Sequence, residues 1–139
     1  MRRAAALAAI LATGIAVPAA TAGTTSVDRS GTTERVKVLD DYYSPVNLKI
    51  HKNDKVKFAW SDNNINTHNV TLSKGPKGVK RGCPTKGPDA YSPLISKCNK
   101  SGVGAIGIKF KKEFDVKGTY KFVCTIHPTV MKLTVKASK

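Results

Sequence analysis

Residues 119–135 read TYKFVCTIHPTVMKLTV and contain two runs in which apolar and polar side chains alternate. The apolar positions are Tyr120, Phe122 and Cys124 in the first run, and Met131, Leu133 and Val135 in the second. A period of two is typical of strands that bury one face in a core. The pattern therefore predicts two strands, joined by a short connection that carries His127.

Alternation of the same kind recurs elsewhere in the chain. In HNVTL (68–72), His68 shares its face with Val70 and Leu72. Three further runs place apolar residues on one face: Val46, Leu48 and Ile50; Val56, Phe58 and Trp60; and Ile106, Ile108 and Phe110. Turn-forming residues separate the runs at 51–55, 61–66 and 116–119. Short strands at this spacing predict an all-β antiparallel sandwich or barrel, interrupted by a long insertion at 73–104.

The chain divides into three parts. Residues 1–22 combine two arginines, an apolar run and a small-residue ending, which predicts a secretory signal peptide. An uncleaved membrane anchor is the alternative for this segment. Residues 23–33 are polar and rich in Gly, Ser and Thr, and we expect a flexible leader. Residues 34–139 would then form one small domain outside the cytoplasm.

The charge of the chain is strongly basic, with a formal net charge of +15 and only nine acidic residues. Such a surface attracts acidic proteins or anionic lipid head groups, although a merely solvated surface is the simpler interpretation. The lysines are scattered and no nucleic-acid-binding motif accompanies them, so we do not expect nucleic acid as a partner.

The three cysteines leave one without a partner if two of them pair. Cys83 and Cys98 lie in the Pro- and Gly-rich insertion, and an exported chain would join them in a disulfide. Cys124 would remain free. A free thiol in an oxidising compartment is a liability unless it is buried or bound to a metal.

Four side chains at strand ends and in the connecting loop could share one metal ion: His68, Cys124, His127 and Met131. A thiolate, two imidazoles and a distant thioether are the ligands of blue-copper electron-transfer sites. Zinc would accept the same nitrogen and thiolate donors, but the thioether favours copper. A Cys124–His127 nucleophile–base pair is the enzymatic alternative, and no orienting third group supports it.

The sequence THNV, followed downstream by Cys124, His127 and Met131, resembles the cupredoxins, which include plastocyanin, pseudoazurin and amicyanin. The resemblance covers about residues 34–137 and implies an antiparallel Greek-key β-sandwich. It also implies that His68, Cys124 and His127 bind copper, that Met131 is the axial ligand, and that Asn69 ties the two ligand loops together. The spacing between His127 and Met131 and the disulfide-tied insertion depart from the family pattern.

The resemblance implies a one-electron carrier with one copper ion per chain, rather than an enzyme. A copper scavenger or delivery protein on the same fold is the alternative. We expect a periplasmic or extracellular monomer that docks on an acidic redox partner protein, with an anionic membrane surface as the alternative partner.

Overall fold

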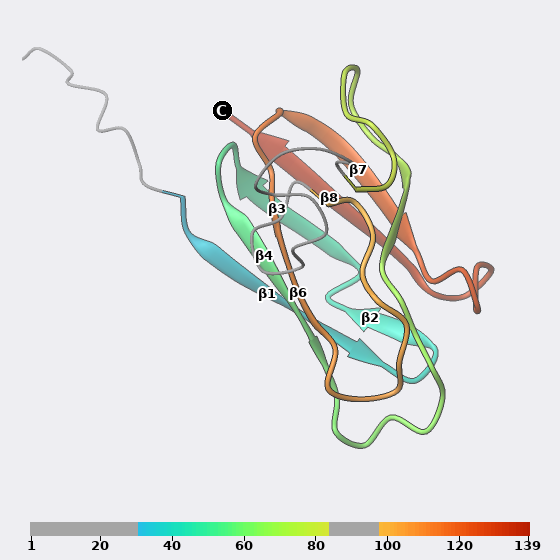
Figure 1. Ribbon diagram of the computed structural model, residues 1–139. Helices are drawn as coiled ribbons and strands as arrows, with labels where there is room; N and C mark the ends of the chain where they lie inside the picture. The colour runs from blue at the N-terminus through green and yellow to red at the C-terminus, as the bar shows by residue number, and fades with distance from the viewer. Residues whose placement is uncertain (1–30, 84–97) are drawn as a thin grey trace, which may run out of the picture.

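The computed structural model describes residues 31–83 and 98–139 and folds them into two β-sheets packed face to face (Figure 1). The described strands are β1 (Thr33–Leu39), β2 (Tyr42–Ser44), β3 (Asn47–His51), β4 (Lys55–Trp60), β5 (Thr71–Lys74), β6 (Lys109–Glu113), β7 (Gly118–Val123) and β8 (Lys132–Ser138). None of these residues forms a helix that is long and apolar enough to cross a membrane. The predicted all-β sandwich is confirmed.

Each sheet has four strands, in the orders β2-β1-β4-β6 and β3-β8-β7-β5. The two sheets are mixed rather than purely antiparallel, because β1 runs parallel to β4 and β3 runs parallel to β8. The chain leaves the first sheet after β2, adds β3 to the second sheet, and returns with β4 on the far side of β1. Alternation within a strand predicts which face is buried, but it does not predict which strand will lie beside it.

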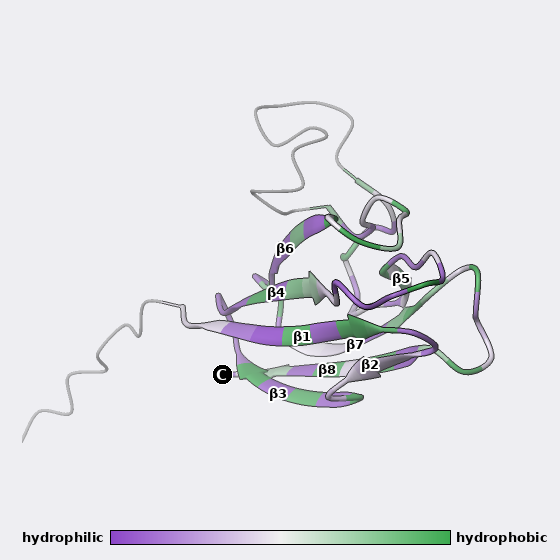
Figure 2. Ribbon diagram, turned by 90° about the horizontal axis from the view of Figure 1, so that it is seen from below, coloured by the Kyte–Doolittle hydropathy of each residue, from purple (hydrophilic) through white to green (hydrophobic). Residues whose placement is uncertain are grey.

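The core lies between the sheets and is built from the predicted inward faces. Phe58 of β4 stacks on Phe110 of β6 at 5.2 Å between ring centroids, and it meets Phe122 of the opposite sheet at 5.9 Å. Along β1 the hydropathy changes from residue to residue (Figure 2), and Val36 and Val38 are fully buried. Each buried side chain of this size stabilises the fold by roughly 1.5–3 kcal/mol.

Two parts of the predicted strand pattern are wrong. Ile106 is 56 % exposed and lies before β6, because Gly107 adopts a positive φ of 73° and breaks the extended course of the chain. Val46 is 50 % exposed and precedes the first residue of β3. The signal for β1, in which Arg35 and Lys37 alternate with buried valines, was present in the sequence but no strand was predicted there.

The predicted disulfide between Cys83 and Cys98 is confirmed. The insertion starts later than predicted, because Ser73 and Lys74 still belong to β5. Beyond the disulfide the chain returns to that strand, where the Leu72 N–H donates to the Asn99 carbonyl at 2.8 Å. Residues 84–97 of the insertion lie outside the described residues.

The predicted signal peptide and most of the predicted leader also lie outside the described residues, which begin at residue 31. The end of the leader joins the sheet, since β1 begins at Thr33 and the Thr32 N–H donates to Asp54 Oδ1 at 2.7 Å. Asp54 also accepts the His51 N–H, so this buried carboxylate fastens the start of β1 to the turn between β3 and β4.

Candidate metal centre

The four predicted ligand residues lie at one end of the sandwich. Cys124 directly follows β7, His127 lies in the connection to β8, and Met131 directly precedes β8. His68 lies just before β5, in an isolated bridge with Gly104. The His68 N–H donates to the Gly104 carbonyl at 3.0 Å, and the Gly104 N–H donates back at 3.2 Å.

The connection between β7 and β8 is closed by its own backbone. The Met131 N–H donates to the His127 carbonyl at 3.0 Å, and the Cys124 N–H donates to the Met131 carbonyl at 3.2 Å. Since β7 and β8 are paired up to Val123 and Lys132, the sheet continues directly into this loop. The loop therefore holds its thiol, imidazole and thioether residues on a paired strand end.

Three of the four residues bring their donor atoms together. The ligand atoms of His68, Cys124 and His127 all lie within 4.8 Å of one another. Cys124 Sγ is 3.8 Å from His127 Nδ1, and the two imidazole centroids are 5.1 Å apart. Met131 lies nearby and is fully buried, as are His68 and Cys124, whereas the His127 side chain is 25 % exposed.

The hydrogen bonds of His68 leave one ring nitrogen available to a metal. Its Nε2 lies 2.8 Å from Asp40 Oδ1, and because a carboxylate accepts, Nε2 carries the proton. Its Nδ1 is buried and has no hydrogen-bond partner. An unpaired buried nitrogen is unfavourable in a folded protein, and a metal ion would remove that penalty. The donor set therefore fits a copper or zinc ion.

Asn69 connects the His68 segment to the loop that follows Cys124. Its Nδ2 donates to Thr125 Oγ1 at 2.7 Å, and its Oδ1 accepts the Thr125 N–H at 2.8 Å. Its backbone N–H points at Cys124 Sγ, 3.5 Å away. This N–H would stabilise a thiolate, and the amide pair holds the two ligand segments in one relative position.

Tyr43 supports Asn69 from β2. Its hydroxyl donates to the Asn69 carbonyl at 2.5 Å, and the residue is fully buried. Burial raises the pKa of Tyr43, and the charge of Cys124 acts in the same direction. The phenol therefore stays a neutral donor next to the site.

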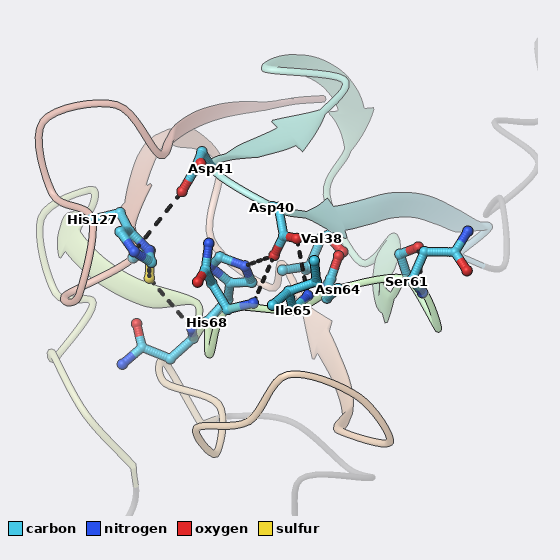
Figure 3. Close-up of polar contacts among 12 residues, drawn as sticks. Val38, Asp40, Asp41, Ser61, Asn64, Ile65, His68 and His127 are labelled. Carbon is cyan, nitrogen blue, oxygen red and sulfur yellow. Dashed lines mark hydrogen bonds and ion pairs between the residues drawn. The ribbon is translucent and has the colours of Figure 1, made fainter.

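Two acidic residues between β1 and β2 contact the two histidines, and sequence reasoning missed both. In Figure 3, Asp40 lies between His68 and the segment that carries Ile65, and Asp41 points towards His127. Asp41 Oδ1 is 3.8 Å from His127 Nε2. The signal that could have found them is the adjacent acid pair at the end of an alternating run, in a chain with only nine acids.

Asp40 accepts three hydrogen bonds. Besides the one from His68, its Oδ2 accepts the Ile65 N–H at 2.9 Å and its Oδ1 accepts the Asn66 N–H at 3.1 Å. The hydrogen bond with His68, followed by the one from Ile65, holds the pKa of Asp40 below its usual value. The carboxylate therefore stays ionised at neutral pH.

Comparison with known proteins agrees with this site. Residues 28–138 match the profile of copper binding proteins of the plastocyanin/azurin family. No curated protein sequence matches the chain. Among solved structures, pseudoazurin from Methylobacterium extorquens AM1 is 19 % identical, with a TM-score of 0.53, and the match covers 77 % of this chain and 76 % of that one.

Two further structures share the fold at similar identity. Amicyanin from Paracoccus versutus is 18 % identical with a TM-score of 0.53, over 81 % of this chain and 86 % of that one. A copper-containing nitrite reductase from Thermus scotoductus SA-01 is 17 % identical with a TM-score of 0.53, over 77 % of this chain. The chain spans only 22 % of that enzyme's length.

The family profile thus agrees with the resemblance that the sequence motifs carried, and with copper as the cofactor. His68, Cys124 and His127 form the candidate copper site, with Met131 nearby. Because the matched residues 28–138 make up most of the chain, the protein belongs to the plastocyanin/azurin family of copper-binding proteins.

Proposed function

We propose that the protein is an exported one-electron carrier with a type 1 copper site. The observation that carries the proposal is a buried thiol and two imidazoles whose donor atoms lie within 4.8 Å of one another. They lie in the connection between the paired strands β7 and β8 and in the segment before β5. His68, Cys124 and His127 would bind the ion and Met131 would be the weak axial donor. When bound, copper would supply the Cu(I)/Cu(II) couple.

The chain's own residues suit rapid electron exchange. The Asn69–Thr125 hydrogen bonds and the closed loop between β7 and β8 hold the ligand segments in place, so little needs to move when the oxidation state changes. The His127 edge is the exposed part of the site, and exposed Ile126 and Val130 lie in the same loop. A redox partner would meet the protein at this edge.

A carrier role is favoured over catalysis by the shape of the site. Buried Met131 lies on the same loop as two of the donors, which would leave little room for a substrate at the metal. We therefore propose that the site transfers electrons and does not hold a substrate.

The test is a visible and EPR spectrum of the purified protein loaded with Cu(II). We expect an intense thiolate-to-copper absorption that is lost in Cys124→Ser. The absorption should remain in the control variant His51→Ala, which changes an exposed histidine that is not among the candidate ligands. A colourless Cu(II) complex would contradict the proposal. Voltammetry then separates two functions, because a carrier gives a reversible couple with fast self-exchange, whereas a scavenger does not require one.

Export is a separate part of the proposal and has its own measurement. If residues 1–22 direct secretion, the chain recovered from outside the cytoplasm should start at Gly23, which N-terminal sequencing detects. Recovery of the uncut chain in the membrane fraction would instead favour an anchor.

A further inference from the structure

The outward face of the sheet β2-β1-β4-β6 gathers positive charge from three neighbouring strands. Its cations are Arg35 and Lys37 on β1, Lys55 and Lys57 on β4, and Lys109 and Lys111 on β6. We call this set the basic face. Register places Arg35 directly beside Lys57, and Lys57 directly beside Lys111. No ion pair to an acid is found for these six within the described residues.

Like charges directly opposite on neighbouring strands destabilise a sheet. The row of Arg35, Lys57 and Lys111 therefore lowers the stability of the sheet when no anion is bound to it. On the outward face of the other sheet, lysines lie beside one another in pairs and form no row of three. Lys136 has Lys49 on one side and Thr119 on the other. Lys121 has Lys74 on one side and Thr134 on the other. Glu113 lies opposite Lys55 at one end of the basic face, but the register places no acid opposite Arg35, Lys57 or Lys111. An anionic surface would neutralise this central row.

We propose that the basic face docks the protein on a bilayer that contains anionic lipids. The face is the flat side of a sheet, and five of its six cations are lysines. A lysine interacts as a point charge, whereas an arginine can form two parallel hydrogen bonds with one carboxylate or phosphate. A hollow on the same side adds apolar groups, hydrogen-bonding groups and one carboxylate, that of Asp62, beside the cations. It is lined by Arg35, Lys37, Leu39, Ala59, Trp60, Ser61, Asp62 and Asn63.

The position of the basic face favours a membrane over a redox protein. β1 and β4 run along the side of the sandwich, towards the end where Asp40 and His68 lie (Figures 1 and 3). A redox protein bound to the flat side would not cover the exposed His127 edge. A bilayer on that side would leave this edge open to a redox partner.

The test compares two triple variants with the same change in net charge. Arg35→Gln, Lys57→Gln and Lys111→Gln neutralise the central row of the basic face, and Lys49→Gln, Lys121→Gln and Lys136→Gln neutralise exposed lysines of the other sheet. Binding to vesicles of phosphatidylglycerol and phosphatidylcholine is measured by co-sedimentation. We expect the first variant to lose on the order of a hundredfold in partitioning and the second to lose far less.

Salt, lipid composition and heparin provide the controls, and none of these measurements requires copper. Wild-type binding should weaken with salt and be absent on pure phosphatidylcholine. Equal losses in both variants would show that net charge alone drives binding, and would overturn the proposal. Retention on heparin without any binding to anionic vesicles would assign the face to a polyanionic polymer and would also overturn it.

A second inference rests on the proposed function and concerns Asp40. We infer that Asp40 is a positioning residue for copper, because it fixes the proton of His68 on Nε2 and leaves Nδ1 facing the other donors. A carboxylate behind a metal-binding histidine sets its tautomer and orientation and raises its basicity. The Ile65 and Asn66 N–H groups hold that carboxylate in place from the opposite side.

Asp41 provides a matched control for Asp40. It is the next residue and carries the same charge, but it is 57 % exposed and 3.8 Å from His127 Nε2. We expect Asp40→Asn to lower Cu(II) affinity by roughly 10- to 100-fold. Asp40→Asn should also raise the reduction potential, because it removes a negative charge that stabilises Cu(II) more than Cu(I). Asp41→Asn should change both quantities much less.

Two results would overturn this inference. One is equal changes in affinity and potential for Asp40→Asn and Asp41→Asn, which would mean that only local net charge matters. The other comes from the metal-free protein, in which ¹⁵N NMR of the His68 ring should find the proton on Nε2. A proton on Nδ1 would contradict the positioning role even if copper binding itself failed.

Discussion

Lys112 lies on the inward side of β6, where it is only 3 % exposed. Its Nζ lies 5.4 Å from the centroid of the Phe114 ring and 5.9 Å from that of Tyr120, and donates to the Glu113 carbonyl at 3.1 Å. Burial lowers the pKa of Lys112 to about 8, although the charges of Asp115 and Glu113 act in the opposite direction. The charged lysine therefore destabilises the fold at neutral pH.

This environment predicts how stability depends on pH. Between pH 8 and the unfolded value of 10.5, the unfolded chain binds more protons at Lys112 than the folded one, so stability should rise with pH in that window. Lys112→Met should stabilise the protein at pH 7, by up to about 3 kcal/mol at 1.36 kcal/mol per pKa unit. Urea unfolding at pH 7 and pH 9.5 measures this, and the advantage of the variant should shrink at the higher pH. A constant difference would contradict the assignment.

The candidate metal ligands could be identified from the sequence, whereas the carboxylates behind them were missed. Cys124, His127 and Met131 lie in one short segment, and their residue types alone suggest copper. Asp40 accepts a hydrogen bond from His68, which lies 28 residues away in the sequence, and it does so from the turn between β1 and β2. The acid pair at the end of an alternating run makes Asp40 noticeable in the sequence, but it does not identify His68 as the partner. That contact depends on how the β1–β2 turn packs beside the loop before β5.

At the scale of strands, the alternating pattern predicted which face of each strand is buried, but not which strands pair with each other. The inward residues of β4, β7 and β8 are buried as predicted, whereas the parallel pairing of β1 with β4 was not foreseen. That pairing brings Arg35 beside Lys57, and so converts scattered lysines in the sequence into the basic face. The charge pattern could therefore be recognised only after the register was known.

The same register predicts that Lys57 opposes folding. Lys57→Thr removes a cation that lies between Arg35 and Lys111, and should stabilise the protein by about 0.2–1 kcal/mol per relieved pair. Lys132→Thr is the control, since it makes the same change on β8 opposite Val123, where no cation faces it. Denaturant midpoints at low salt compare the two. Similar gains would mean that threonine's preference for strands, rather than relieved repulsion, explains the effect.

At the scale of the molecule, the disulfide closes the insertion without forming the copper site. Cys83 and Cys98 are separated by 15 residues, a loop whose closure is worth about 3 kcal/mol in the chain-entropy model. Cys83→Ser with Cys98→Ser should lower the free energy of unfolding by about that amount. The copper absorption should persist, because the donor residues come from other segments. Loss of the absorption in folded variant protein would show that the insertion shapes the site.

The whole fold and the copper ion should also stabilise each other. The donors come from two separate segments, 68 and 124–131, and only the folded sandwich brings them together. An ion that binds only the folded state adds about 4.1 kcal/mol when free copper is 1,000 times its dissociation constant. Thermal unfolding should therefore shift upwards with copper in the wild type and hardly at all in Cys124→Ser. An equal shift in both proteins would place the stabilising ion elsewhere, and the buried unpaired Nδ1 of His68 would then have no ligand to explain it.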